Sequence, residues 1–332
     1  MAKWYLGEGE QNDVAISTRI RLARNLAEYP FPARLDNRTR IQVNETVRDA
    51  VPPAARLQYI EMKTLTQAQI VSMAEKHIIS PEFASSTDGR ALLLSEDEEI
   101  SVMLNEEDHI RLQVMKSGLA LEKAYDTADK LDTAINDRVR FAFDERLGYL
   151  TECPTNLGTG MRASVMLHLP ALTALGRVGT LAGTVAKLGL TIRGANGEGS
   201  APMGDLYQIS NQVTLGISEK AAIENLKTIV LQIAAQERAA RTELLKTLET
   251  EDSVYRAYGT LKSARLLNTK EFLSLASKVR MGAVGGLLQV DVKTITELMF
   301  SLQPAGINAI VGKTLDARAR DEQWAKLVRE RL

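Results

Sequence analysis

Three short apolar runs that follow one another closely place the strongest constraint on the fold. They cover 91–94, 100–104 and 110–115, and the short polar segments 95–98 and 105–108 separate them. A parallel crossover needs roughly a dozen or more residues between strands, whereas an antiparallel pair can be joined by a tight turn. The spacing therefore predicts an antiparallel sheet built from hairpins.

Helical patterns flank these runs and fill the last part of the chain. Ser218 is of the residue type that caps a helix, and apolar side chains follow it at helical spacing. From there to Leu332 only helices are predicted, with breaks near Asp252, Asn268, 285–286 and Pro304. Upstream, helices are predicted over 38–50, 66–79, 119–139 and 177–188, and further strands over 163–169, 189–193 and 205–210. The pattern predicts an α+β fold, an antiparallel sheet flanked by helices, followed by an all-helical region.

Composition excludes several classes of protein. With 41 Lys plus Arg against 42 Asp plus Glu, the net charge is −1, which argues against a protein that coats nucleic acid. One cysteine and three histidines leave neither a disulfide scaffold nor a His/Cys zinc cluster. The N-terminus lacks the apolar core of a signal peptide, and the longest uncharged run, 163–176, is too short to span a membrane. We expect a cytoplasmic protein that acts on neither membranes nor nucleic acid.

The usual phosphate-binding loops are absent from the sequence. Gly312-Lys313-Thr314 looks like the end of a P-loop, but the upstream glycine, Gly306, is one residue too far away and no strand is predicted before it. A nucleotide would therefore be held without a conventional glycine loop.

Arginines in extended segments and loops are the clearest chemical signal. Arg19 and Arg21 alternate along an extended segment, so both side chains point to one side. Arg111 follows an acidic turn, Arg162 ends a run of turn-forming residues, and Arg193 opens a glycine-rich loop. A guanidinium presents five donors in a planar fork that suits phosphate oxygens. Converging arginines could hold a triphosphate, although most surface arginines are simply solvated.

For four other positions, the residue types alone do not separate a structural role from a functional one. The acidic segment 106–108 has the composition of a solvated turn, whereas Glu198 lies between glycines in a loop that could deliver it to a ligand. Cys153 precedes a proline, and an isolated cysteine is more often an inert small apolar residue than a reactive thiolate. His77 has the position of a residue that ends a helix.

The same segments resemble, in sequence order, the ATP:guanido phosphotransferases, the family of creatine and arginine kinases. The matching segments are 17–21 (STRIR), 105–111 (NEEDHIR) and 153–164 (CPTNLGTGMRAS). Segments 17–32 and 75–81 (EKHIISP) are similar to the bacterial protein-arginine kinase branch. Kinases for free guanidines carry a helical domain before the first arginine pair, and here that pair begins at residue 19. The resemblance implies a catalytic domain over 10–240 and a helical dimerisation and regulatory domain over 241–332.

The resemblance also implies roles for individual residues. Phosphate-holding arginines correspond to Arg19, Arg21, Arg111, Arg162 and Arg193. Nucleotide-contacting segments correspond to Ser17, Thr18, Arg19, Ile20 and Arg21, to Arg162, Ala163, Ser164, Val165 and Met166, and to Arg193, Gly194, Ala195, Asn196, Gly197 and Glu198. His77 matches a histidine near the adenine, Glu107 and Glu198 match two carboxylates that bracket the acceptor guanidinium, and Cys153 matches a thiol beside it.

The implied reaction is phosphorylation of arginine side chains on proteins by ATP with Mg²⁺. A guanidinium is a poor nucleophile because its nitrogen lone pairs are delocalised and its pKa exceeds about 12. Two carboxylates can orient its plane, and one can take the departing proton. We expect Glu107 to be the orienter and base, Glu198 its partner, and Cys153 an auxiliary. No metal-ligating residue is predicted.

Alternatives remain beside this interpretation. The second hypothesis is a kinase for free arginine or another small guanidine. The third is a binding module, either a catalytically inactive relative or a protein that binds phosphoarginine. The family implies roles in stress response and protein quality control, with the zinc-binding activator McsA, the repressor CtsR and the ClpC–ClpP protease as partners. We also expect a homodimer, on the argument that helices such as 271–279 cannot bury their apolar face alone.

One motif departs from the branch pattern. Protein-arginine kinases typically carry Arg-Asp-x-x-Arg-Ala in a C-terminal phosphoarginine pocket, and here Arg320 and Asp321 are followed by Trp324 in place of the second arginine. We expect the pocket to bind phosphoarginine weakly or not at all. Alternatively, Trp324 is a core residue of the last helix.

Overall fold

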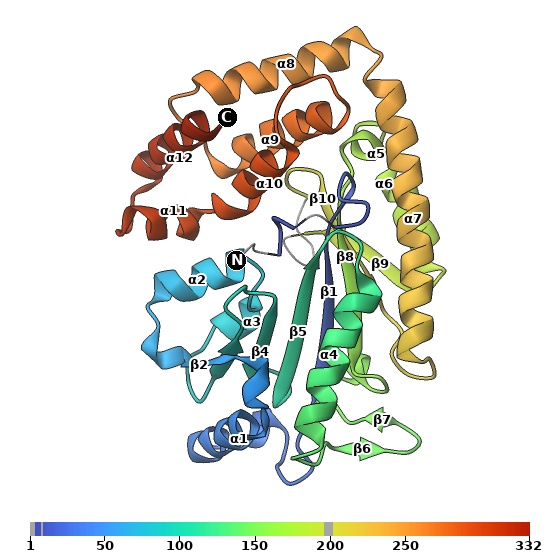
Figure 1. Cartoon of the computed structure of the whole chain (residues 1–332), viewed down its shortest axis with the longest axis vertical. Coiled ribbons are helices and arrows are strands. Elements are labelled where there is room, and N and C mark those ends of the chain that lie inside the picture. The colour runs from blue at the N-terminus through green and yellow to red at the C-terminus, as the bar shows by residue number, and fades with distance from the viewer. Residues whose placement is uncertain (1–3, 8, 196–201) are drawn as a thin grey trace.

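An antiparallel sheet forms the centre of the computed structural model, which describes residues 4–7, 9–195 and 202–332 (Figure 1). Within these residues eight strands pair in the order β2-β3-β4-β5-β1-β8-β10-β9. The strands are β1 (Ala15–Arg24), β2 (Gln58–Glu61), β3 (Ala91–Leu94), β4 (Ile100–Leu104), β5 (Ile110–Ser117), β8 (Met161–His168), β9 (Leu190–Gly194) and β10 (Leu206–Asn211). The predicted hairpins β3–β4 and β4–β5 are confirmed, because both pairs are antiparallel.

The central strand β1 determines which side chains face which side of the sheet. It pairs with β5 and β8, and Arg21 stands opposite Gln113 on one neighbour and Arg162 on the other. Ile20 and Leu22, which alternate with the arginines, are fully buried in the main core. Strand alternation therefore sends the arginines to the face away from that core.

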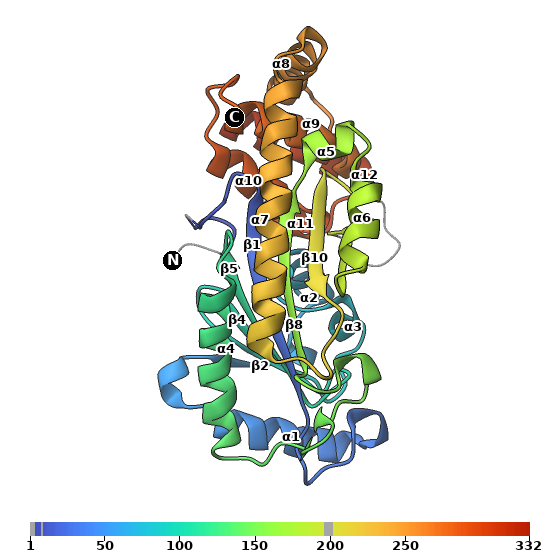
Figure 2. The same ribbon diagram turned by 90° about the vertical axis from the view of Figure 1, so that its right-hand side faces the viewer.

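Two long helices cover the core face of the sheet, α4 (Leu121–Asn136) and α7 (Glu219–Leu244), as Figure 2 shows. Ser218 caps α7, its hydroxyl oxygen accepting a hydrogen bond from the main-chain N–H of Ala221. This confirms the predicted cap. The proposed domain boundary after residue 240 falls inside α7, so the division into 10–240 and 241–332 stays a prediction.

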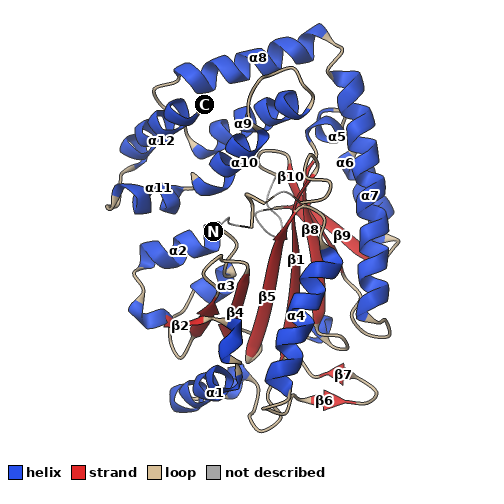
Figure 3. Ribbon diagram, in the orientation of Figure 1, coloured by secondary structure: helices blue, strands red, loops and turns tan. Residues whose placement is uncertain are grey.

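Five shorter helices and a small hairpin also surround the sheet (Figure 3). They are α1 (Asn37–Ala50), α2 (Gln67–Glu75), α3 (Pro81–Ala84), α5 (Pro170–Ala174), α6 (Val178–Ala186) and the hairpin strands β6 (Phe143–Asp144) and β7 (Gly148–Tyr149). The helix predicted over 66–79 ends at Glu75, because His77 takes a left-handed backbone conformation with φ 58°. β2 and this hairpin were not predicted, since each offers too few residues to show an alternating pattern.

A second core lies among the C-terminal helices. These are α8 (Leu248–Ser263), α9 (Thr269–Val284), α10 (Val292–Ser301), α11 (Pro304–Val311) and α12 (Ala317–Arg331). Their core also takes in Trp4 and the sheet residues Met115 and Met166, so these helices pack on one end of the sheet. The break predicted near Asp252 is wrong: it lies at 245–247, where Thr247 caps α8.

The apolar face of α9 is covered within the chain. Phe272, Ala276 and Val279 are fully buried in the second core, together with residues of α8, α10 and α12. The argument that this helix requires a second copy is therefore wrong, because its neighbours bury the face instead. Dimerisation itself stays a prediction. In the described part of the chain, no helix is long and apolar enough to cross a membrane.

Candidate functional site

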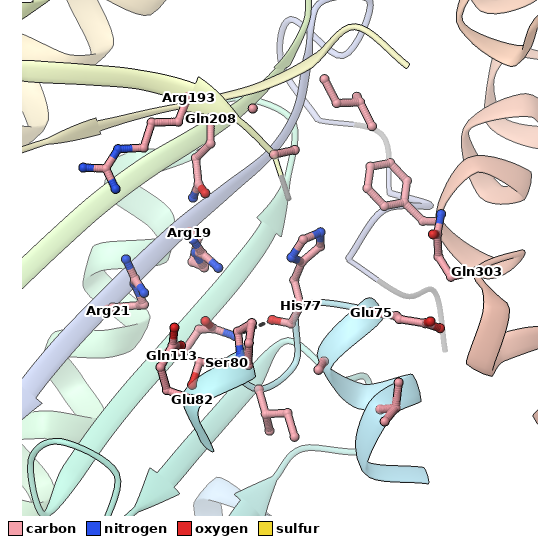
Figure 4. Close-up of a pocket in the computed structure, with 18 of the residues that line it drawn as sticks. Arg19, Arg21, Glu75, His77, Ser80, Glu82, Gln113, Arg193, Gln208 and Gln303 are labelled. Atoms are coloured by element: carbon pink, nitrogen blue, oxygen red, sulfur yellow. Dashed lines mark hydrogen bonds between the residues drawn. The ribbon is translucent and has the colours of Figure 1, made fainter. Parts of the chain in front are cut away.

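A cleft of about 1200 Å³ opens on the sheet face opposite α4 and α7. Its floor is formed by side chains of β1, β5, β8, β9 and β10, among them all five predicted arginines: Arg19, Arg21, Arg111, Arg162 and Arg193. Figure 4 shows Arg19 and Arg21 of β1 and Arg193 of β9 on one side of this space. The structure thus brings together residues that are up to 174 positions apart in the sequence (193 − 19).

The arginine cluster concentrates positive charge in a partly buried place. Burial, with the nearby charges of Arg111 and Arg162, lowers the pKa of Arg19 to about 10. The pKa of Arg21 is lowered well below its ordinary value, first by burial and then by Arg19 and the same two neighbours. Among the described residues, the Nε atoms of Arg19 and Arg21 find no hydrogen-bond acceptor. Such a cluster favours a polyanionic ligand, which would relieve the repulsion.

Glu106 forms an ion pair with Arg111 of this cluster, a role that the sequence did not predict. Its Oε1 accepts a hydrogen bond from Arg111 Nη1 at 2.5 Å and another from the Ser80 hydroxyl at 2.5 Å. Its side chain is 3% exposed, so the ion pair is shielded from solvent. Glu106 therefore fixes the direction in which Arg111 presents its remaining donors.

The acidic segment 106–108 is not a solvated turn, which corrects the composition-based reading. Asp108 is buried and accepts hydrogen bonds from Asn25 Nδ2 at 2.6 Å and from the main-chain N–H of Glu152 at 2.8 Å. Burial raises the pKa of Asp108. Only Glu107 points outward, with 41% of its side chain exposed. Composition cannot separate these roles, because they depend on where the turn folds back.

A smaller side cavity of about 130 Å³ adjoins the cleft and shares Arg21, Glu107, Arg111 and Arg162 with it. Glu107 and Cys153 both line this side cavity, as the resemblance implied. The complete lining is Arg21, Ala23, Glu107, Arg111, Cys153, Thr155, Asn156, Gly160 and Arg162.

Contacts within the side cavity hold Glu107 loosely. Its Oε2 lies 3.8 Å from Arg111 Nη2 and 3.5 Å from Asn156 Nδ2. The Cys153 sulfur lies 3.0 Å from the Thr155 hydroxyl. Glu107 thus presents a partly exposed carboxylate beside the arginine cluster, with a thiol near it.

Several predicted contact residues face away from the cleft. The side chains of Thr18, Ile20, Ala163 and Val165 are fully buried and do not line it, because strand alternation turns them to the opposite face. The remaining strand positions outside the lining are Ser17, Ser164 and Met166. Gly194 and Ala195 do line the cleft. Asn196, Gly197 and Glu198 lie outside the described residues.

His77 follows α2 and lies between Arg19 and Gln303 in Figure 4. Its main-chain carbonyl accepts a hydrogen bond from Gln113 Nε2 at 2.8 Å, which ties it to the sheet. Burial and the charge of Arg19 lower the pKa of His77 to about 4. Its imidazole is therefore neutral at pH 7 and offers an uncharged aromatic face near the arginines.

The depressed pKa of His77 makes stability depend on pH. The neutral form is favoured in the folded state, so this contribution is complete above pH 6.5 and is lost as pH falls toward about 4. His77→Asn keeps a residue type that tolerates a positive φ but removes the titration. Between pH 6.5 and about 4, the wild type should lose more unfolding free energy than the variant, by up to about 1.4 kcal/mol per pH unit. Urea unfolding at several pH values measures the difference; parallel curves would contradict it.

The C-terminal motif is built into the second core. Trp324 is fully buried and its ring centroid lies 5.4 Å from that of Phe272. The main-chain carbonyl of Asp321 accepts a hydrogen bond from the N–H of Leu267. Trp324 is thus a core residue of α12, and neither Arg320 nor Asp321 lines the cleft. The weakened phosphoarginine pocket stays a prediction.

Comparison with known proteins gives two family matches. Residues 40–240 match the family "ATP:guanido phosphotransferase, C-terminal catalytic domain", and residues 247–332 match the family "Protein-arginine kinase McsB C-terminal domain".

Relatives and solved structures agree with these matches. The protein-arginine kinase of Halothermothrix orenii is 44% identical over all of this chain and 97% of its own length. That of Caldanaerobacter subterraneus is 43% identical over 96% of this chain and 97% of its own length. The crystal structure of lombricine kinase superposes with a TM-score of 0.62 at 26% identity, covering 70% of this chain and 68% of that chain.

Proposed function

We propose, for a chain that belongs to the ATP:guanido phosphotransferase family, that the arginine cluster holds the phosphates of ATP and the side cavity holds the acceptor guanidinium. The enzyme is a protein-arginine kinase, which phosphorylates arginine side chains of proteins. The observation that carries the assignment is the contact between the two cavities. Arg21, Arg111 and Arg162 line both, so a phosphate held by them lies next to Glu107.

The arginine cluster supports the phosphate assignment through its charge. Phosphoryl transfer passes through a loose transition state whose charge is spread over the phosphate oxygens, so positioning and electrostatic stabilisation supply most of the catalysis. Arg111, fixed by Glu106, and the partly buried Arg19 and Arg21 are placed before ATP binds. Little reorganisation is then needed during the reaction.

The side cavity supports Glu107 as the residue that activates the acceptor. The Glu107 carboxylate orients the guanidinium and takes the proton from its attacking nitrogen. A bond forms between that nitrogen and the γ-phosphorus, and the bond to the bridging oxygen breaks to release ADP. Cys153 would contribute a second polar contact to the guanidinium. By the family resemblance, Glu198 would be the second carboxylate of the acceptor site.

Mg²⁺ is proposed as the partner of ATP. It usually keeps several waters and binds through substrate phosphates plus one or two carboxylates, and it would neutralise phosphate charge here. The described residues contain no cluster of three or more potential metal ligands. We therefore propose that Mg²⁺ is bound mainly by the phosphates of ATP rather than by protein side chains.

The proposal on the wider biology rests on the family resemblance alone. We propose a cytoplasmic homodimer that acts in stress response and protein quality control. The zinc-binding activator McsA, the repressor CtsR and the ClpC–ClpP protease are the proposed partners. Co-purification of each protein with the kinase tests these assignments one by one.

The product provides the direct test of the reaction. Transfer to a guanidinium nitrogen gives a phosphoramidate, so label transferred from γ-labelled ATP to an unfolded protein should be lost in acid and persist in mild base. Free arginine in a parallel reaction should receive little label. Label that survives the acid wash would show a phosphoester instead, and equal labelling of free arginine would favour a small-guanidine kinase.

A further inference from the structure

One wall of the cleft is made by the C-terminal helices. Leu273 of α9, Met299 and Phe300 of α10, and Gln303 and Pro304 at the start of α11 all line it. Facing them are Val71, Ala74, Glu75 and His77 from α2 and the turn that follows it. In Figure 4, Glu75 and Gln303 lie on the side of the cleft away from Arg19, Arg21 and Arg193. The cleft thus has a strongly cationic end and a more apolar end.

Glu75 ties the two sides of the apolar end together. Its carboxylate accepts hydrogen bonds from the main-chain N–H of Ala305, at 3.1 and 2.9 Å, and of Gly306, at 3.2 Å. These donors belong to the first turn of α11, where helix N–H groups need an acceptor. Glu75 on α2 therefore supplies the cap of α11 from a position about 230 residues away.

An aromatic cluster packs against the His77 ring. The Trp4 ring centroid lies 6.4 Å from that of His77 and 5.3 Å from that of Phe300. Tyr5 stacks on Phe300 with centroids 5.8 Å apart. Trp4 is 1% exposed, so it fills the space between α10 and the turn that carries His77. Moving α10 would therefore move the packing behind His77.

We propose that the junction of α10 and α11 forms the base-side wall of the nucleotide site, and that Glu75 is the positioning residue that holds it there. The adenosine part of ATP lies between this wall and His77. Apolar surface from Met299 and Phe300 suits the faces of a purine, and the Gln303 amide can donate to or accept from its edge. The inference rests on the proposed function, because the arginine cluster must hold the phosphates.

Glu75→Gln tests the inference through two ligands. The substitution removes the charge facing the helix N-terminus and one of the two acceptor oxygens. It should weaken binding of ATP about tenfold, the loss of roughly one charge-assisted hydrogen bond. Binding of tripolyphosphate, which needs only the arginine cluster, should stay unchanged. The kcat at saturating ATP should stay within about twofold, because the contact serves substrate and transition state alike.

Glu237→Gln is the matched control. The Glu237 carboxylate accepts hydrogen bonds from the main-chain N–H groups of Ala171 and Leu172, both at 2.9 Å, at the start of α5, and it does not line the cleft. Glu237→Gln should leave the affinities for ATP and for tripolyphosphate unchanged. Gln303→Ala provides a second variant at the wall and should also weaken ATP but not tripolyphosphate.

Three outcomes would overturn the inference. Equal weakening of ATP and tripolyphosphate by Glu75→Gln would show a general disturbance of the fold. Unchanged ATP binding in both Glu75→Gln and Gln303→Ala would show that the wall does not contact the nucleotide. A wild type that binds ATP but not tripolyphosphate would instead contradict the phosphate role of the arginine cluster, and the inference would fail with it.

Discussion

Glu107→Gln is expected to lower kcat by about 10²–10⁴-fold, the usual value of a positioned general base. Glutamine keeps the shape of the side chain but can neither take the proton nor offset the guanidinium charge. ATP affinity should change by less than about threefold, because the Glu107 carboxylate is partly exposed and, being an anion, does not itself bind phosphate oxygens. Single-turnover transfer to an unfolded protein substrate measures the first quantity, and equilibrium nucleotide binding measures the second.

Asn156→Ala is the control for this variant. The Asn156 amide lies 3.5 Å from Glu107 and lines the same cavity, but it cannot act as a base at pH 7. We expect it to reduce kcat by less than about tenfold, as a contact that only orients the carboxylate. If Glu107→Gln retains more than about a tenth of wild-type turnover, another group takes the proton.

Arg21→Lys is expected to lower kcat by about 10²–10³-fold. Arg21 lines both the cleft and the side cavity, so in the proposed complex its guanidinium would lie between the phosphates and the acceptor. Lysine keeps the positive charge but replaces a planar fork by a single compact ammonium, which cannot contact two oxygens in the same geometry. Steady-state kinetics with varied ATP should show the loss mainly in kcat.

Arg38→Lys is the matched control for Arg21→Lys, because Arg38 is exposed on α1 and does not line either cavity. It should leave kcat and KM unchanged. A comparable loss in both variants would point to a general effect of lysine substitution. A fall in ATP affinity with kcat preserved would place Arg21 in ground-state binding rather than in stabilising the transition state.

The site was found in part from the sequence and in part only from the fold. Five arginines, Glu107 and Cys153 could be named beforehand because the motifs that carry them match a family in order. Glu106 could not be distinguished from its neighbours, since its burial and its contact with Ser80 depend on α3 packing against the turn before β5. Residues of the base-side wall, such as Phe300, could not be identified from the sequence, because an apolar residue that lines a cleft has the same helical pattern as one in the core.

The sequence by itself determined most of the longer elements and the antiparallel connections among β3, β4 and β5. The short polar turns between the apolar runs favour antiparallel pairing of β3, β4 and β5. Ser218 precedes a long stretch of apolar residues at helical spacing, and α7 begins directly after it at Glu219. Alternation around Ile20 predicted that Arg19 and Arg21 share one face. These features depend on neighbouring residues, and local physical chemistry is enough to predict them.

Only the tertiary structure decided which groups meet. Arg21 comes to face Arg162 because β1 pairs with β8, and the Glu75 carboxylate caps α11 because the C-terminal helices fold back over the end of the sheet. It also decided that the apolar face of α9 is buried within the chain rather than against a second copy. Such contacts join segments far apart in the sequence. They depend on the packing of the whole chain, which no local pattern encodes.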